Sequence, residues 1–137
     1  MPASVKLVTW NVNSIRQRLE RLIALLARHA PDVVCLQETK VTDADFPVAA
    51  LREAGYATAF AGQKSYNGVA ILAKREPAEV TCGFRDGAND GQARLIAATV
   101  ADVRVICAYV PNGQAVGTEK YAYKLEWLER LRRMLER

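Results

Sequence analysis

The sequence predicts an α/β fold with one sheet covered by helices. Two short apolar runs, at 6–10 and 33–36, flank a stretch in which apolar residues recur at helical spacing from Ile15 to Leu26. Such a strand–helix–strand unit is typical of α/β proteins. After Gly55 the chain changes to short apolar runs separated by turn residues, which predicts several strands in succession. The 137 residues, 50% of them apolar, are enough for one domain with a sizeable core.

The first unit has clear boundaries. Residues 6–10 are predicted to form a short buried strand, and Asn13 or Ser14 to cap the helix that follows. Pro31 stops that helix, and residues 33–36 form the second strand. Because a helical crossover joins them, the two strands are expected to be parallel.

Downstream, the sequence predicts a short helix, a series of strands and a final helix. The short helix covers about 47–54 and ends at Gly55, and the final helix begins at about Glu119. The strands are predicted at 56–61, 69–73, 78–84, 94–100 and 103–110.

Turn residues indicate how these strands connect. Asn67-Gly68 marks a turn between two of the strands, and Ala101-Asp102 is a tight connection between two others, which predicts an antiparallel hairpin. The polar, glycine-rich stretch 85–92 is predicted to be a loop.

The charge balance is compatible with an anionic partner. Lys and Arg number 19 against 15 Asp and Glu, which gives a net charge of +4. DNA would suit this excess, but an ordinary basic soluble protein would have the same balance, so charge alone leaves both readings open.

The cysteines favour a reducing compartment. Cys35, Cys82 and Cys107 each lie in an apolar run and are expected to be buried as small hydrophobic residues. Their odd number and the lack of CxxC spacing argue against a disulfide framework and against a zinc site. With no signal-peptide pattern and no apolar run of membrane-spanning length, a cytoplasmic protein without membrane contact is expected.

Polar residues follow three of the predicted strands. Asn11 follows the first strand, Glu38 the second, and Tyr109 lies at the end of the last. Ligands of open α/β sheets bind outside the carboxyl ends of parallel strands, so Asn11 and Glu38 are expected to share one cleft. Whether Tyr109 joins them depends on the direction of its strand.

Each of these residues has a chemical and a structural interpretation. A divalent cation such as Mg²⁺ would compensate the Glu38 carboxylate, and so would an ion pair with Lys40. Asn11 could orient water or a metal ligand, or it could cap a turn. Tyr109, protonated at neutral pH, could donate to a phosphate oxygen, or it could be a half-buried aromatic of the sheet.

An ordered set of motifs resembles the exonuclease III-type abasic-site (AP) endonucleases, members of the endonuclease/exonuclease/phosphatase superfamily. The resemblance covers essentially the whole chain in family order, so it is more specific than any single motif. The matching stretches are 10–16 (WNVNSIR), 36–40 (LQETK), 66–72 (YNGVAIL), 93–96 (ARLI), 109–113 (YVPNG) and 120–128 (KYAYKLEWL).

The resemblance assigns catalytic roles to three residues. Glu38 matches the metal-binding glutamate, and Asn11 matches the asparagine that supports the metal and the nucleophile. Tyr109 matches the tyrosine that contacts the scissile phosphate. Asn13 stands where relatives carry an aspartate, which puts a metal role for position 13 in doubt.

Four more residues match positions that lie near DNA. Asn112 corresponds to a residue near the DNA phosphate, Arg16 to an arginine along the DNA backbone, and Tyr66 to an aromatic near the minor groove. Arg94 corresponds either to a backbone contact or to a structural ion-pair partner.

The resemblance implies a DNA repair enzyme that is only half present. Residues 1–137 would be the N-terminal half of a four-layer αββα sandwich, with one mixed sheet covered by helices on one face. The complete enzyme would use Mg²⁺ or Mn²⁺ to hydrolyse double-stranded DNA at abasic sites, as an AP endonuclease and 3′–5′ exodeoxyribonuclease.

The second half of the family's motifs has no counterpart in this chain. The later Gly-Asp-Phe-Asn and Ser-Asp-His stretches do not occur, and the only histidine, His29, lies in the first helix. The chain alone is therefore expected to be inactive, with the missing C-terminal half as its partner. Two alternatives are a related phosphatase or phosphodiesterase that acts on small phosphate esters, and a non-catalytic DNA-binding fragment.

Overall fold

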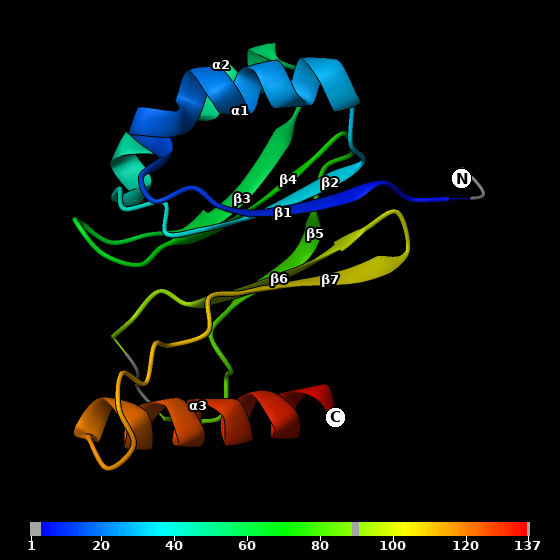
Figure 1. The fold of residues 1–137 in the computed structure, drawn as a ribbon. Helices are drawn as coiled ribbons and strands as arrows, with labels where there is room; N and C mark the ends of the chain where they lie inside the picture. Colours follow the sequence, from blue (N-terminus) through cyan, green and yellow to red (C-terminus); the bar gives the residue numbers. More distant parts are fainter. Residues whose placement is uncertain (1–3, 89–90, 137) are drawn as a thin grey trace.

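The chain folds into four layers, with helices on the outside and two sheets face to face (Figure 1). The computed structural model describes residues 4–88 and 91–136. The helices are α1 (Ile15–His29), α2 (Val48–Glu53) and α3 (Glu119–Leu135), with a 3-10 turn at Asp43–Asp45. The strands are β1 (Leu7–Asn11), β2 (Val33–Gln37), β3 (Ala57–Ala61), β4 (Val69–Ala73), β5 (Ala78–Cys82), β6 (Leu95–Val100) and β7 (Val103–Ala108).

The first sheet has the strand order β1-β2-β4-β3. β1 and β2 are parallel, as predicted for strands joined by a helix, whereas β4 runs antiparallel to both of its neighbours. Ser14 is the N-cap of α1, its hydroxyl accepting from the Gln17 N–H at 3.4 Å. The helix ends at Ala30, whose left-handed φ of 44° precedes Pro31. The predicted β–α–β unit is therefore confirmed.

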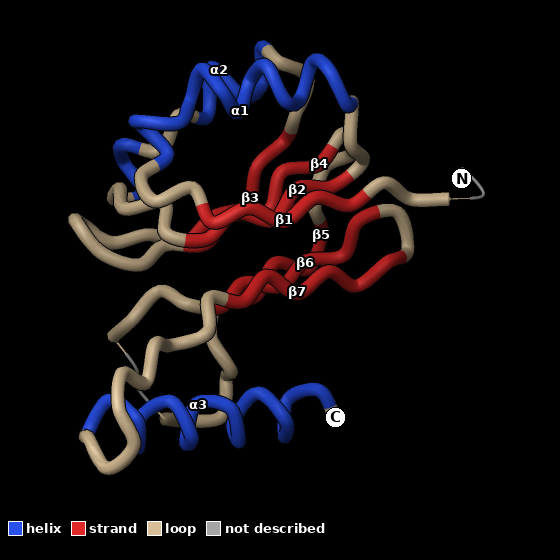
Figure 2. Tube along the Cα trace, in the orientation of Figure 1, coloured by secondary structure: helices blue, strands red, loops and turns tan. Residues whose placement is uncertain are grey.

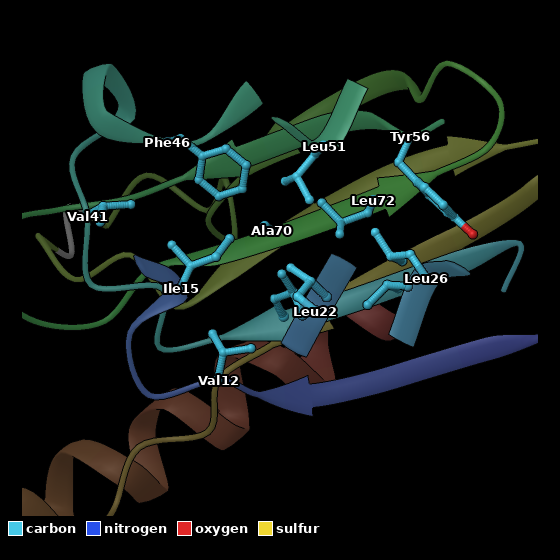
Figure 3. Close-up of a cluster of buried hydrophobic side chains, with 12 residues drawn as sticks. Val12, Ile15, Leu22, Leu26, Val41, Phe46, Leu51, Tyr56, Ala70 and Leu72 are labelled. Carbon is cyan, nitrogen blue, oxygen red and sulfur yellow. The ribbon is translucent and has the colours of Figure 1, made fainter. Parts of the chain in front are cut away.

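One hydrophobic core lies between the first sheet and helices α1 and α2 (Figure 3). Ile15, Leu22 and Leu26 point from α1 onto the sheet, where they meet Leu72 and Ala70 of β4. Truncating one such leucine to alanine costs about 2–5 kcal/mol, so this core holds the helix layer in place. The loops at the ends of β1 and β2 are fixed by the same packing.

The second sheet was not predicted from the sequence. β5, β6 and β7 form a separate antiparallel sheet whose inner face packs on the first sheet (Figure 2). Ile71 of β4 and Ile96 of β6 are both fully buried in the core between the sheets. α3 covers the outer face, where Trp127 meets Phe84 edge to face at 5.1 Å between ring centroids.

The predicted α/β class and the mixed sheet covered by helices on one face are confirmed. The expectation of a single sheet is wrong, because the strands form two sheets and the second packs on the inner face of the first. The two predicted turns both join antiparallel strands. The predicted loop at 85–92 contains no helix or strand in its described residues, and residues 89 and 90 lie outside them.

Two burial predictions also need correction. β1 was expected to be buried, but it forms an edge of its sheet, and Leu7 is 59% exposed. Cys35 and Cys107 are buried as expected, whereas Cys82 is exposed because it ends the edge strand β5. Among the described residues, no helix combines the length and the apolar character needed to cross a membrane.

Candidate functional site

Three strand ends bring the predicted catalytic residues together. Asn11 is the last residue of β1, Glu38 follows β2, and Tyr109 follows β7 in the other sheet. The Tyr109 hydroxyl lies close enough to the Glu38 carboxylate to lower the pKa of Glu38. β7 therefore ends at the same edge of the molecule as β1 and β2, which answers the question that the sequence left open.

The Glu38 carboxylate is held from several sides. Asn11 donates from Nδ2 to Oε1 at 2.9 Å, and the Lys40 ammonium lies 3.6 Å from Oε2. Partial burial would raise the pKa of Glu38, but the hydrogen bonds from Asn11 and Tyr109 and the charge of Lys40 outweigh it. The pKa therefore lies below its ordinary value, and the carboxylate is ionised at neutral pH.

Tyr109 stays protonated, as expected. Burial raises the pKa of its phenol, and the hydrogen bond to ionised Glu38 raises it further, against the opposing charge of Arg94. The phenol is therefore a hydrogen-bond donor at the mouth of the site across the physiological pH range.

Arg94 supports Tyr109 directly. Its guanidinium lies 4.7 Å from the centre of the Tyr109 ring, and Nη1 donates to the Tyr109 carbonyl at 3.3 Å. The Tyr109 N–H donates in turn to the Arg94 carbonyl at 2.8 Å. Arg94 was predicted to be either a DNA-backbone contact or a structural ion-pair partner. These contacts give it a structural role, but its partner is Tyr109 and not a carboxylate. The contact with DNA stays a prediction.

Asn11 and Asn13 tie the first loop to the second. The Asn11 Oδ1 accepts from the Asn13 N–H at 3.1 Å, so the Asn11 side chain directs its nitrogen at Glu38 and its oxygen at its own loop. The Asn13 Oδ1 accepts from Lys40 Nζ at 2.6 Å. In this arrangement Asn11 orients the carboxylate, and its predicted role as a metal ligand stays a prediction.

The loop backbones around Glu38 are strained and interlocked. Glu38 and Lys40 both have left-handed φ values, 55° and 58°. The Ser14 N–H donates to the Glu38 carbonyl at 2.9 Å, and the Lys40 N–H donates to the Asn67 carbonyl at 2.9 Å. Neighbouring loops thus satisfy the backbone groups of the segment that presents Glu38.

Gly68 allows this close approach. It has a φ of +99°, and a Cβ at this position would collide with the side-chain oxygen of Thr39, which is only 1% exposed. A side chain at position 68 would push the loop of Glu38 out of place.

We expect Gly68→Ala to lower the free energy of unfolding by about 3 kcal/mol or more, because overpacking adds to backbone strain. Gly55→Ala is the matched control, since Gly55 has a similar φ of +97° but no atom near the added Cβ. Strain alone should cost Gly55→Ala about 1–2 kcal/mol. Urea unfolding of both variants checks this, and equal losses would contradict a steric role for Thr39.

A groove of about 540 Å³ runs beside Tyr109 and gathers three further predicted residues. Tyr66, Arg94 and Asn112 line it together with Tyr109, and the Tyr66 side chain is 72% exposed. Residues without a predicted role complete the lining: Gln63, Asn67, Gln92, Pro111, Gln114, Lys120 and Tyr123. Such a mixture of cationic, amide and aromatic groups suits a nucleic-acid backbone.

Gln63 was missed by the sequence reasoning. Its Oε1 accepts from Asn67 Nδ2 at 2.8 Å and from the Ala93 N–H at 2.7 Å, so it fixes the turn that carries Tyr66. An amide in a loop gives no pattern in the sequence. Lys120 and Tyr123 could have been grouped from the sequence. Residues three apart lie on the same face of a helix, and both residues lie in the first turns of α3.

Arg16 lies outside this groove. It is in the first turn of α1, and its guanidinium forms a salt bridge of 3.0 Å with Asp45, with both side chains more than half exposed. A pair this exposed contributes little stability, so Arg16 remains available to a phosphate.

The donor set could hold a divalent cation through one carboxylate. The described residues contain no group of three or more His, Cys, Asp or Glu side chains placed to hold a metal. Glu38 is nevertheless ionised and oriented, and Mg²⁺ is commonly held by one or two carboxylates with waters and substrate phosphates. Glu38 is thus the residue of this chain that would hold the metal.

Known proteins are similar to this chain in sequence and in fold. The model of the Endonuclease/Exonuclease/phosphatase family matches residues 8–135. Exodeoxyribonuclease III of Haemophilus influenzae is 35% identical over 97% of this chain and 52% of its own length.

Two solved structures have the same fold as this chain. The 3′ phosphatase NExo from Neisseria, bound to a product DNA hairpin, has a TM-score of 0.94 and 43% identity over 96% of this chain and 51% of its own. An AP endonuclease from Archaeoglobus fulgidus has a TM-score of 0.92 and 46% identity, with 96% and 51% covered. The chain thus spans about half the length of these relatives. With its motifs in family order and its strand ends gathered around Glu38, the chain belongs to the Endonuclease/Exonuclease/phosphatase family.

Proposed function

We propose that this chain forms half of a metal-dependent nuclease that hydrolyses DNA phosphodiester bonds at abasic sites. The observation that carries the proposal is the convergence of Glu38, Asn11 and Tyr109 beside a groove lined by Arg94 and Asn112. The similarity to an exodeoxyribonuclease III, a 3′ phosphatase and an AP endonuclease supports a phosphate ester of DNA as the substrate.

The residues of this chain would bind and orient the scissile phosphate. A bound Mg²⁺ or Mn²⁺ would supply charge stabilisation to the phosphate and to the leaving oxygen. Glu38 would hold the metal, with Asn11 as its orienting donor. Tyr109 would turn its one hydroxyl proton from Glu38 to a non-bridging oxygen of the phosphate as negative charge develops there. Asn112 and Lys120 line the groove where the flanking phosphates would lie.

Selection of an abasic site would use the exposed turn at Tyr66. A sugar that lacks its base is easier to rotate out of the helix, and an aromatic side chain can fill the space that it leaves. Tyr66 is exposed, and Gln63 fixes the turn that carries it, so it is placed to probe the duplex.

Three substrates separate the candidate activities. A protein completed with the remaining half of a relative should nick an abasic duplex in the presence of Mg²⁺. It should do so faster than it removes a 3′-phosphate or shortens an intact duplex from its 3′ end. A preference for small phosphate esters over all three DNA substrates would replace the nuclease proposal with the phosphatase alternative.

Arg16 tests the DNA contact without catalysis. We expect Arg16→Ala to weaken binding of the chain to an abasic duplex and to lower the slope of log K against log salt by about 0.9, the loss of one phosphate contact. Arg28→Ala, in the last turn of the same helix, should leave the slope unchanged. Fluorescence anisotropy at several salt concentrations measures both, and identical slopes would assign Arg16 to a solvated helix face.

A further inference from the structure

The side-chain amide of Gln37 joins three strands that end at the candidate site. Gln37 is the last residue of β2 and directly precedes Glu38. Its Nε2 donates to Thr9 Oγ1 of β1 at 3.0 Å and to Cys107 Sγ of β7 at 3.5 Å. The Cys107 thiol donates in turn to the Leu36 carbonyl of β2 at 3.3 Å. Because β7 belongs to the other sheet, these bonds connect both sheets.

The partners of this amide lie directly behind the candidate catalytic residues. Thr9 precedes Asn11 by two residues on β1, and Cys107 precedes Tyr109 by two residues where β7 ends. Strand residues two apart point to the same face of a sheet, so a contact that fixes Thr9 also directs Asn11. The amide thus holds the neighbours of Asn11 and Tyr109, and its own backbone leads into Glu38.

These bonds affect placement more than stability. Thr9 is exposed, so water can replace the amide as its donor, and a thiol is a weak acceptor. The core around Cys107 is apolar, and apolar contacts are non-directional. Hydrogen bonds do have a preferred direction, so they can fix how the ends of β1, β2 and β7 lie relative to one another.

We propose that Gln37 is a positioning residue whose amide sets the spacing of Asn11, Glu38 and Tyr109. The inference rests on the proposed nuclease function, in which these three residues orient one phosphate and its metal. A displacement of about 1 Å in such a site can lower the rate about 100-fold. An amide that does not touch the substrate can therefore still control the rate.

NMR tests this placement without catalysis. In the 137-residue chain, nuclear Overhauser effects between the Asn11 side-chain amide protons and the Glu38 methylene protons report the hydrogen bond of 2.9 Å between these residues. Gln37→Met keeps the length of the side chain but removes the donor, and it should abolish these signals. Gln17→Met is the matched control, because Gln17 is exposed on α1, and it should keep them.

Two variants of Thr9 test the same hydrogen bond from its acceptor. Thr9→Val removes the hydroxyl but keeps the branched shape, whereas Thr9→Ser keeps the hydroxyl and loses a methyl group. Thr9→Val should weaken the signals between Asn11 and Glu38, and Thr9→Ser should keep them. A loss of packing alone would give the opposite order, so this pair separates positioning from packing.

Kinetics extend the test to a protein completed with the remaining half of a relative. Gln37→Met should lower kcat for an abasic duplex by about 10–100-fold with KM unchanged, and Thr9→Ser should restore nothing because it loses nothing. If the completed wild-type protein does not cleave DNA, the proposed function is wrong, and the NMR comparison still decides the role of Gln37. Signals that persist in Gln37→Met, or that Thr9→Ser loses as readily as Thr9→Val, would overturn the inference. So would an unchanged kcat for Gln37→Met in an active completed protein.

Discussion

Glu38→Gln, in a protein completed with the remaining half of a relative, is expected to lower Mg²⁺-dependent cleavage of an abasic duplex by at least about 100-fold. The substitution removes the negative charge but keeps the size of the side chain and its acceptor for Asn11 Nδ2. Glu38 is the ionised carboxylate at the meeting point of three strand ends. The substitution would therefore remove the charged ligand of the metal. Rates measured across a series of Mg²⁺ concentrations check this.

Glu20→Gln is the matched control, because Glu20 is an exposed glutamate on α1. It should leave both the rate and its Mg²⁺ dependence unchanged. If Glu38→Gln also leaves them unchanged, Glu38 is simply the ion-pair partner of Lys40, at 3.6 Å, and the metal binds elsewhere.

The 137-residue chain alone is expected to show no measurable nicking of an abasic duplex. Hydrolysis needs a positioned water as well as an oriented phosphate. The site offers one ionised carboxylate with orienting amides and a phenol, and the described residues contain no group of three or more His, Cys, Asp or Glu side chains that could hold a metal ion. Phosphate binding without water activation gives no cleavage.

Adding the remaining half of the Neisseria relative, which is 43% identical to this chain over the matched region, should restore nicking. Nicking is measured with each half alone and with the two mixed. Robust cleavage by the purified chain alone would contradict this prediction and direct the search for a water-activating base to Asp43, Asp45 and Asp90, of which Asp90 lies outside the described residues.

The sequence predicted those parts of the fold that leave local signals. The strand at 69–73 matches β4 residue for residue, and the turns at Asn67-Gly68 and Ala101-Asp102 join the strands they were predicted to join. The long helices were found because their apolar residues recur on one face.

The features that were missed depend on long-range contacts. Alternating and apolar runs do not say which strands share a sheet, so the division into two sheets and the edge position of β1 could not be predicted. Cys82 looks like a core residue in its run, and its exposure follows only from its place at the end of an edge strand.

The site was predicted better by motif than by position. Glu38, Asn11 and Tyr109 do meet, but the strand direction that brings Tyr109 to Glu38 is a property of the second sheet. Arg94 stacks on Tyr109, which lies 15 residues along the chain, and Gln63 accepts from the N–H of Ala93, which lies 30 residues along. No local sequence pattern predicts these two contacts.

The contact between Gly68 and Thr39 has a consequence for how such a site can evolve. The loop of Glu38 and the turn at position 68 share backbone hydrogen bonds and leave no room for a Cβ between them. A mutation that alters the course of one loop is tolerated only if the other changes with it. Side chains that point outward, such as Tyr66 and Lys120, are free of this coupling. New substrate preferences would therefore arise by exchanging these outward residues on loops whose paths are inherited together.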